Sequence, residues 1–357
     1  MCNKTLTKAA WRLTIATFNM STLRDNSMSS SHPSIQFACA PVSWGVEDYS
    51  GPSWDQPYEK ILDEMVECGY TGTELGPYGF FPTEAGKLLP ELQGRRLKML
   101  SSFVPVNLAD PSVAAEAAER IREVGSLLAA LGAPCIVLAD YQSKERENMA
   151  GRVPRDGTAS LSADQWKSVA RLGREAERIA GDFGLDLVFH PHVATFIETP
   201  EETDRFFDAV SASSIGLCLD TGHCLYGGGD PVAIADRYKE LLRYIHIKDI
   251  DRAVLQESHR KQLNFDQAIE AGVFSEIGEG CIDFPSFFSL LERNGYKGWC
   301  VVEQDIKFGV STVSPRQSMG ASLEYLRNVV ETLKLDNNGR DVSRTAPEAV
   351  LYRDTAR

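Results

Sequence analysis

The chain has 357 residues, in which 37 lysines and arginines stand against 50 aspartates and glutamates, giving a formal net charge of −13. An acidic protein repels nucleic-acid phosphates and anionic membrane surfaces, so neither is expected as a partner. No apolar run approaches the roughly 18 residues that a membrane span requires. With 43% hydrophobic and 24% charged residues, the composition is that of a globular protein with a substantial core.

Short β-type runs alternate with longer amphipathic segments from residue 35 to residue 335. Asp110 precedes a proline and opens an alanine-rich helix that ends at Gly132, and Ser162 and Thr199 each begin a capping box. The eight candidate strands are residues 35–40, 72–75, 97–102, 135–139, 186–190, 215–220, 244–248 and 299–303. Eight strand-helix units predict an α/β fold, a single (β/α)8 TIM barrel.

The alternative fold is an open doubly wound sheet. That fold normally carries a glycine fingerprint after its first strand, and residues 43–46 (Ser-Trp-Gly-Val) do not form one. Two connections, residues 141–161 and 249–283, are too long to be simple linkers. Because both follow a strand, we expect them to lie over the active face of the barrel and to cap a substrate.

Three parts are expected along the chain: a flexible N-terminal extension (1–34), the barrel domain (35–335) and a flexible C-terminal tail (336–357). The extension has four basic residues against one acid and is rich in serine and threonine. It resembles a transit peptide, but an upstream start codon before Met28 is preferred. Eight dispersed cysteines without a C-x-x-C pair predict reduced thiols and a cytoplasmic location.

Histidines and acids gather at the ends of the last four predicted strands. Side chains alternate between the two faces of a strand, and the bulky face of residues 215–220 should meet the helices, which directs Asp220 inward. The same alternation directs His190, His246 and Glu303 inward. Each of these four consecutive strands therefore offers one ligand-type side chain to the mouth of the barrel.

Two carboxylates and two imidazoles suit a divalent transition metal better than Ca²⁺, which prefers oxygen ligands throughout. Mn²⁺ or Co²⁺ is favoured, with Zn²⁺, Fe²⁺ or Mg²⁺ as alternatives. Any one of the four residues could instead be an ordinary polar residue at a strand end. Their joint occurrence on consecutive strands favours a metal site formed by His190, Asp220, His246 and Glu303.

These motifs resemble the xylose-isomerase-like TIM barrels, which include sugar isomerases, epimerases and inosose dehydratases. The resemblance covers residues 35 to about 333, and its segments look like those of inosose dehydratases. It implies that Asp220, His246 and Glu303 occupy metal-ligand positions. At the fifth strand many isomerases and epimerases have a glutamate, whereas inosose dehydratases have a histidine-rich segment, as around His190 here. The segments are residues 72–76, 190–192, 220–223, 246–249, 280–285 and 303–305.

The resemblance implies a metal-stabilised enediolate, from which either dehydration or isomerisation can follow. Since one of the two glutamates of related epimerases is replaced, we expect a metal-dependent dehydratase, a lyase acting on a cyclic keto-polyol such as scyllo-inosose (2-keto-myo-inositol). Glu303 would bind metal and move the proton, and His223 or Lys248 would stabilise or protonate the leaving oxygen. His192 would orient His190 or contact a ring hydroxyl.

Three further residues are candidates for substrate binding, each with a structural alternative. Trp44 could stack on the ring or be a packed aromatic residue. Glu74 could bind hydroxyls or pair with Lys248. Gln142 begins the first long connection and could contact substrate or be solvated. His259 lies in a charged run that predicts an exposed helix face.

Other functions remain open at this stage. A keto-sugar isomerase or epimerase, or a lyase that cleaves 3-keto-glycosides, could use the same metal site. Phosphodiester cleavage is disfavoured by the acidic charge and by the presence of only six histidines. A non-catalytic sugar-binding barrel is the remaining alternative. The expected partner is a small keto-polyol or keto-sugar, and a homo-oligomer is compatible with the sequence.

Overall fold

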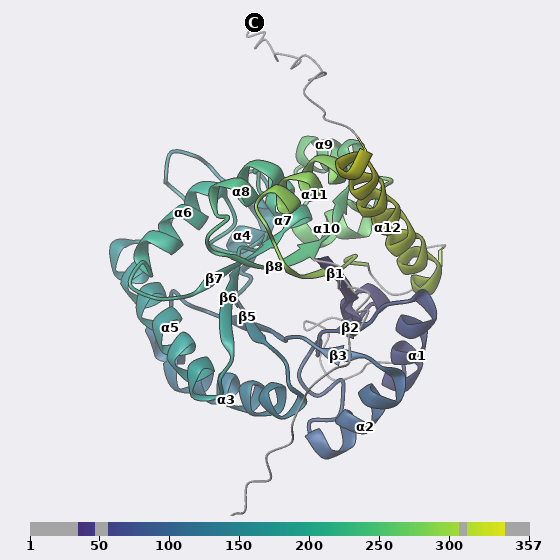
Figure 1. The fold of residues 1–357 in the computed structure, drawn as a ribbon. Coiled ribbons are helices and arrows are strands. Elements are labelled where there is room, and N and C mark those ends of the chain that lie inside the picture. Colours follow the sequence, from purple (N-terminus) through teal and green to yellow (C-terminus); the bar gives the residue numbers. More distant parts are fainter. Residues whose placement is uncertain (1–34, 47–55, 307–312, 340–357) are drawn as a thin grey trace, which may run out of the picture. The chain divides into compact units, whose positions relative to one another are not determined.

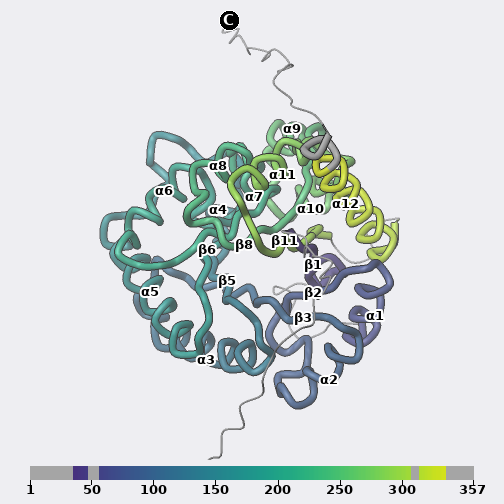
Figure 2. The backbone as a smooth tube through the Cα atoms, in the orientation of Figure 1, coloured from purple at the N-terminus to yellow at the C-terminus, as the bar shows by residue number. Residues whose placement is uncertain are grey.

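A ring of parallel strands surrounded by helices forms the fold (Figures 1 and 2). The computed structural model describes residues 35–46, 56–306 and 313–339, all within the unit Ser34–Arg357. The predicted extension, residues 1–34, and most of the predicted tail lie outside the described residues. The strands of the ring are β1 (Ile35–Cys39), β2 (Gly72–Thr73), β3 (Lys98–Met99), β4 (Phe103–Val106), β5 (Cys135–Asp140), β6 (Asp186–His190), β7 (Gly216–Asp220), β8 (Leu242–Ile247) and β11 (Gly298–Val302).

These nine segments make eight barrel strands, because β3 and β4 are two halves of the third. They pair in the order β3-β2-β1-β11-β8-β7-β6-β5-β4. The amide of Leu100 donates to the Thr73 carbonyl, and the amide of Val137 donates to the Ser102 carbonyl, both at 3.0 Å. The ladder therefore passes without a gap through the third strand and closes the barrel. The predicted TIM barrel is confirmed, although the sequence analysis missed β4, which contains a proline without an N–H group.

Twelve α-helices are found in the described residues, and several begin at the predicted caps. The Asp110 side chain accepts from the Ser112 amide, and both predicted capping boxes are present. The helices are α1 (Tyr58–Cys68), α2 (Ala85–Arg95), α3 (Ala114–Leu131), α4 (Lys144–Met149), α5 (Ala163–Asp182), α6 (Pro200–Ala209), α7 (Thr221–Tyr226), α8 (Pro231–Arg237), α9 (Arg252–Arg260), α10 (Phe265–Glu270), α11 (Phe284–Arg293) and α12 (Pro315–Gly339), with 3-10 turns η1 (Pro41–Trp44) and η2 (Pro111–Val113). Helix α12 runs four residues into the predicted tail.

The side-chain alternation predicted for the strands is confirmed by two separate hydrophobic clusters. Inside the barrel, Cys218 packs with Val188, Tyr244 and Val301. Outside it, neighbours on the same strands, such as Leu219 of β7, pack against the helices. Because of this alternation, the inward-facing polar residues at the carboxyl ends of the strands point into the mouth of the barrel.

The second long connection, between β8 and α11, carries structure of its own and is anchored by one carboxylate. It contains α9, α10 and a two-stranded antiparallel sheet of β9 (Asp249–Ile250) and β10 (Phe274–Ser275). Both oxygens of Asp249 accept two backbone amides each, from residues 250, 278, 280 and 282. A Cβ on Gly280 would lie 2.2 Å from the Asp249 carboxylate, so only glycine allows this approach.

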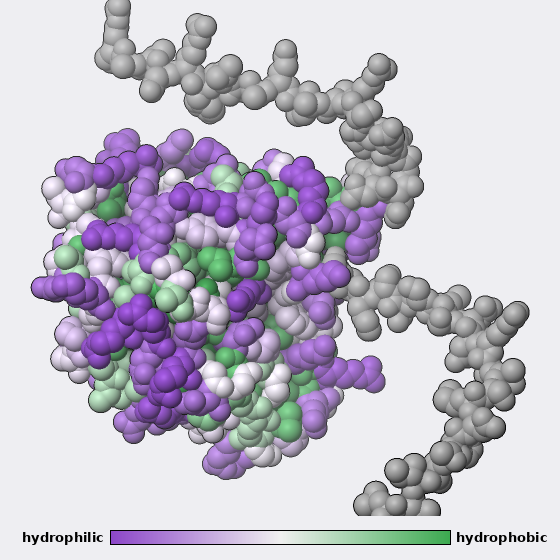
Figure 3. Space-filling model, turned by 60° about the vertical axis from the view of Figure 1, so that its left-hand side comes forward, coloured by the Kyte–Doolittle hydropathy of each residue, from purple (hydrophilic) through white to green (hydrophobic). Residues whose placement is uncertain are grey.

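The surface is predominantly hydrophilic on the face shown in Figure 3, where hydrophobic side chains form only small patches. Among the described residues, the large hydrophobic side chains that are exposed are Val66, Tyr141 and Val313. No helix in residues 35–46, 56–306 and 313–339 has both the length and the apolar character needed to cross a membrane.

We predict that replacing Asp249 with asparagine lowers the free energy of unfolding by about 2–4 kcal/mol, because the amide side chain leaves buried N–H groups without an acceptor. Asp251→Asn is the matched control. The Asp251 side chain caps α9, a position where asparagine serves equally well, so a change under about 0.5 kcal/mol is expected. Urea unfolding of both variants measures this. Equal stability of the two would contradict the anchoring role of Asp249.

Candidate active site

A pocket with both apolar and polar lining residues opens at the carboxyl ends of the barrel strands. Helix α10, strand β4 and the segments that follow β1 and β2 supply the apolar residues, and strands β6 and β8 and the segments that follow β6, β8 and β11 supply most of the polar ones. The apolar lining residues are Ala40, Val42, Val46, Pro77, Phe103, Phe265 and Ile269, and the polar ones are Glu74, Gln142, His190, His192, His246, Lys248, Asp266, Glu303 and Asp305.

A buried lysine just after β8 contacts acidic residues from the two strands that lie on either side of β8. The Nζ atom of Lys248 lies 2.9 Å from Oδ2 of Asp220 and 2.5 Å from Oε2 of Glu303. Asp305, two residues further along, has its Oδ1 atom 3.4 Å from the same nitrogen. These side chains are buried or nearly buried, so water screens the ion pairs only weakly. The ammonium therefore ties three carboxylates together at the base of the pocket.

On the other side of the same cluster, Glu74 orients His246. Oε1 of Glu74 lies 2.9 Å from Nε2 of His246, and because a carboxylate accepts, this nitrogen carries a proton. The other ring nitrogen, Nδ1, faces the acids: it lies 3.8 Å from Oδ2 of Asp220 and 3.4 Å from Oε2 of Glu303. A carboxylate that fixes the ring of a histidine in this way is typical of metal sites.

The side chains fit a divalent cation on three observations. Ligand atoms of His190, Asp220 and His246 all lie within 4.8 Å of one another, and so do those of Glu74, His246 and Glu303. The Nδ1 atoms of His190 and His246 are buried without a hydrogen-bond partner. Three buried carboxylates, those of Glu74, Asp220 and Glu303, and the partly buried carboxylate of Asp305 surround one ammonium, that of Lys248, and the ring of His246, an excess of negative charge that a cation would offset.

A second group of potential ligands overlaps the first. His190, His192 and His223 also bring one ring nitrogen each within 4.8 Å of one another. Of these, the Nδ1 atom of His192 is engaged by the Val193 carbonyl at 2.7 Å, and the Nδ1 atom of His223 faces the Val193 amide at 3.4 Å. In the other two groups the Nδ1 atoms of His190 and His246 have no such contact, and carboxylates balance the charge. The four ligands predicted from the sequence are divided between those two groups.

Burial and neighbouring charges shift the pKa values of the site in different directions. Burial, followed by the charge of His246, holds the pKa of His190 well below its usual range, and burial with His223 does the same for His192. Neutral imidazoles with free lone pairs are the form that binds metal. Burial alone would raise the pKa of Asp220, but Lys248 and the histidines around it lower it.

The acids of the cluster are not equivalent. Burial raises the pKa of Glu303, and the opposing effect of His246 and Lys248 does not cancel it. Burial also opposes ionisation of Asp305, but Lys248 and His223 outweigh it and lower the pKa of Asp305 to about 2. Glu303 is therefore the more basic of these two carboxylates, as a proton acceptor should be.

The structure separates the predicted catalytic and substrate residues into those that line the pocket and those that do not. Glu74, Gln142, His192 and Lys248 line it. His223 does not: it is 1% exposed and lies behind the pocket, with Nε2 3.5 Å from Oδ2 of Asp305. Of the two proposed acids, only Lys248 thus reaches the pocket.

Three expectations are corrected. Trp44 does not reach the pocket, because η1 turns its indole into the core, where Nε1 donates to Oε2 of Glu64 at 2.7 Å. The prediction that Trp44 stacks on a ring is wrong, and the alternative of a packed aromatic holds. His259 is not on an exposed face either: its Nε2 atom is buried without a partner beside Tyr226. Finally, Glu74 pairs with His246 and not with Lys248.

The sequence analysis missed several pocket residues. Asp305 was noted only as part of a motif, although its position two residues after Glu303 was a usable signal. Phe265, Asp266 and Ile269 come from α10, inside the long connection that was expected to cover the active face. Their lining of the pocket agrees with that expectation.

A family model described as "Xylose isomerase-like TIM barrel" matches residues 62–329. The chain belongs to the xylose isomerase-like TIM barrel family. It is 36% identical over 273 residues to the rhizopine catabolism protein MocC of Rhizobium meliloti, covering 76% of this chain and 82% of that protein. It is 33% identical over 272 residues to the inosose dehydratase of Geobacillus kaustophilus, covering 76% and 87%.

Solved structures share the fold. An L-ribulose 3-epimerase superposes with a TM-score of 0.64 at 16% identity, covering 87% of this chain and 100% of that one. The IolI protein with a bound zinc atom gives a TM-score of 0.62 at 16% identity, covering 84% and 99%. These two structures show the fold. The family model and the inosose dehydratases confirm the predicted family and the prediction of an enzyme of the dehydratase type, a lyase.

We predict that the metal-free protein binds one Mn²⁺ per chain, and that Asp220→Asn or His190→Ala weakens binding at least about 100-fold, since even outer partners of metal sites contribute 10–100-fold. His192→Gln should retain the metal, and so should the control His259→Gln, which changes a histidine outside the site. Isothermal titration calorimetry measures each affinity. Loss of binding in His192→Gln with retention in Asp220→Asn would place the ion instead among the histidines around His223.

Proposed function

We propose that the protein dehydrates an uncharged cyclic keto-polyol, and that this substrate is scyllo-inosose (2-keto-myo-inositol). The similarity to inosose dehydratases over 76% of the chain supports this substrate. The charge of the pocket supports it too. The described lining residues include four acids, Glu74, Asp266, Glu303 and Asp305, but a single lysine, Lys248, and no arginine. Such a pocket repels phosphorylated and carboxylated sugars but accepts a neutral polyol.

The mixed lining of the pocket suits a polyol ring. In scyllo-inosose the hydroxyls project from the edge of the ring, so its two faces present mainly C–H groups. Side chains such as Phe103 and Phe265 can cover such a face. The carboxylates and imidazoles of the lining can exchange hydrogen bonds with the hydroxyls along the edge.

The observation that carries the proposal is the contact of 2.5 Å between Nζ of Lys248 and Oε2 of Glu303. In an elimination, the Glu303 carboxylate accepts the proton from the carbon next to the ketone. The C–O bond to the β-hydroxyl breaks, the Lys248 ammonium donates a proton to the departing oxygen, and water leaves. The enol product then tautomerises to a diketone.

The same contact resets the site after each turnover. Once water has left, Glu303 is protonated and Lys248 is a neutral amine. A proton can then pass directly from the Glu303 carboxyl group to the Lys248 amine. Epimerisation instead requires acid-base groups on opposite faces of the substrate, whereas these two groups adjoin. The adjoining pair therefore favours dehydration over epimerisation.

A divalent ion held by His190, Asp220, His246 and Glu303, with Mn²⁺ or Co²⁺ the best match to this donor set, would supply Lewis-acid polarisation of the ketone. Glu74 supports this arrangement by holding His246 with Nδ1 towards the acids. His192, which lines the pocket, contacts a ring hydroxyl in this proposal. Location in the cytoplasm and self-association stay predictions.

We expect metal-loaded protein to convert scyllo-inosose into an ultraviolet-absorbing enolised diketone, and chelation with EDTA to abolish the reaction until Mn²⁺ or Co²⁺ is restored. NMR in deuterated water follows the products. Loss of a ring hydroxyl supports dehydration. Deuterium exchange without hydroxyl loss would show an epimerase, and no change in the substrate would exclude scyllo-inosose.

Lys248→Met keeps an unbranched side chain, one atom shorter, and removes the ammonium group, so we predict that kcat falls by about 100-fold or more. Lys167→Met is the matched control, because Lys167 pairs with Asp164 at 2.8 Å on the exposed surface of α5. The activity of the Lys167→Met variant should match that of the unchanged protein. Steady-state kinetics with the same substrate compares the two. A Lys248→Met variant with near-normal kcat would rule out this lysine as the acid.

A further inference from the structure

The segment that follows β6 makes hydrogen bonds to two histidines through a single residue, Val193. Its carbonyl oxygen lies 2.7 Å from Nδ1 of His192. A carbonyl can only accept, so this Nδ1 carries a proton and Nε2 keeps the lone pair. Its amide donates towards Nδ1 of His223 at 3.4 Å. That nitrogen must therefore hold the lone pair, and Nε2 of His223 carries the proton. One residue thus places two neighbouring imidazoles in opposite tautomers.

The backbone around Val193 is strained and is held by side chains. Ala194 has a φ of 67°, in the left-handed region that residues other than glycine rarely adopt. Its amide donates to Oε2 of Glu198 at 2.9 Å. The Thr195 hydroxyl donates to the His192 carbonyl at 2.7 Å and accepts from the Ile197 amide. Without these contacts the strained peptide would relax and turn its N–H and C=O groups away from the histidines.

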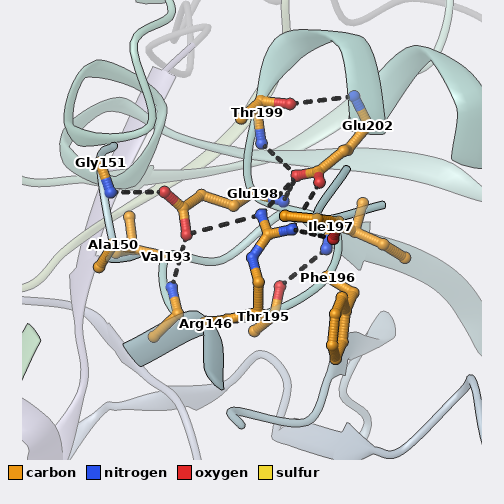
Figure 4. A network of polar contacts seen from close by, with 12 residues as sticks. Arg146, Ala150, Gly151, Val193, Thr195, Phe196, Ile197, Glu198, Thr199 and Glu202 are labelled. Atoms are coloured by element: carbon orange, nitrogen blue, oxygen red, sulfur yellow. Dashed lines mark hydrogen bonds and ion pairs between the residues drawn. The ribbon is translucent and has the colours of Figure 1, made fainter. Parts of the chain in front are cut away.

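Glu198 is itself fixed by a buried network, shown in Figure 4. Its other oxygen accepts from the Gly151 amide at 2.7 Å, and Oε2 lies 3.9 Å from the Arg146 guanidinium. Arg146, on α4, also makes a two-pronged contact with Glu202 of α6 at 2.7 and 2.8 Å. The network therefore connects the first long connection to the segment after β6.

The charged residues of this network, Arg146, Glu198 and Glu202, do not line the pocket, so they would not touch a substrate bound there. A buried ion pair is in general no more stabilising than a well-packed apolar group, and its best-supported role is to specify one conformation. The conformation specified here is that of residues 193 and 194.

We propose that Glu198, held by Arg146, positions the Val193 peptide and thereby sets the tautomers of His192 and His223. His192 then presents an Nε2 lone pair that can accept a hydrogen bond from a substrate hydroxyl. The Nε2 atom of His223, which carries the proton in this tautomer, lies 3.5 Å from Oδ2 of Asp305. The tautomers follow from the contacts alone, whereas the effect on turnover rests on the proposed function.

Two-bond ¹H–¹⁵N NMR spectra of protein labelled with ¹⁵N-histidine test the tautomers directly, because they show which ring nitrogen carries the proton. Metal-free and zinc-loaded protein are both suitable, and the variants His192→Gln and His223→Gln assign the signals. We expect His192 to be protonated on Nδ1 and His223 on Nε2. The opposite tautomer at either residue would overturn the proposal. No substrate is needed, so failure with scyllo-inosose leaves this test intact.

Glu198→Gln tests the positioning role, since its amide group cannot accept from both backbone N–H groups. We expect mixed tautomers at both histidines and a kcat lower by on the order of tenfold, with a smaller change in KM. The matched control is Glu177→Gln. Glu177 also accepts a backbone amide, from Ser214 at 2.6 Å, but this contact lies before the amino-terminal end of β7, whereas the site residues follow the carboxyl ends of the strands. The spectra and kcat of this variant should not change.

Thr195→Val provides a second perturbation in case the Glu198 variant does not fold. It removes the hydroxyl that joins the carbonyl of His192 to the amide of Ile197, with little change in volume. The same mixing of tautomers is expected. A folded variant of either kind that keeps both tautomers unchanged would overturn the positioning role.

Discussion

The register of four adjacent parallel strands is the constraint on which the site depends. In that register Asp220 pairs directly with His246 and His246 with Val301, so the ends of β7, β8 and β11 lie at one level. Side chains alternate along each strand, and the apolar positions are fixed by packing against the helices. The acids and imidazoles at the strand ends are therefore forced into one buried volume, although burying charge is costly.

The charges in this volume balance one another only in part. Lys248 lies within ion-pair distance of three carboxylates, and removing any partner would leave a buried charge without compensation. Such a cluster lowers stability, but in the function that we propose it holds the proton donor Lys248 against the proton acceptor Glu303 and leaves ring nitrogens available to a cation. The anchoring of the long connection by Asp249, the residue after Lys248, joins the same strand to the covering segment that carries α10.

Most of the fold, and the gathering of polar residues at the carboxyl ends of the last four barrel strands, could be predicted from the sequence because they depend on local patterns. Strand alternation alone directed His190, Asp220, His246 and Glu303 to the mouth. The predictions that were wrong, such as that of Trp44 in the pocket, concerned the paths of the segments that connect the strands and helices. The turn of η1 that carries Trp44 into the core leaves no periodic signal.

Contacts between residues distant in sequence could not be predicted either. Glu74 and His246 are 172 residues apart and meet across the barrel, and Arg146 and Glu202 are 56 residues apart. Such pairs meet only in the folded barrel, so the secondary-structure propensities of the residues and their spacing in the sequence do not predict these contacts. The same holds for the backbone of Val193, whose role depends on a single residue with positive φ.

The most direct test of the central claim is a crystal structure of the protein grown with Mn²⁺, with anomalous diffraction recorded at the manganese absorption edge. The account predicts one anomalous peak within bonding distance of His190, Asp220, His246 and Glu303, with Nζ of Lys248 beside it. A peak bound elsewhere, or none in the barrel mouth at saturating Mn²⁺, would contradict it.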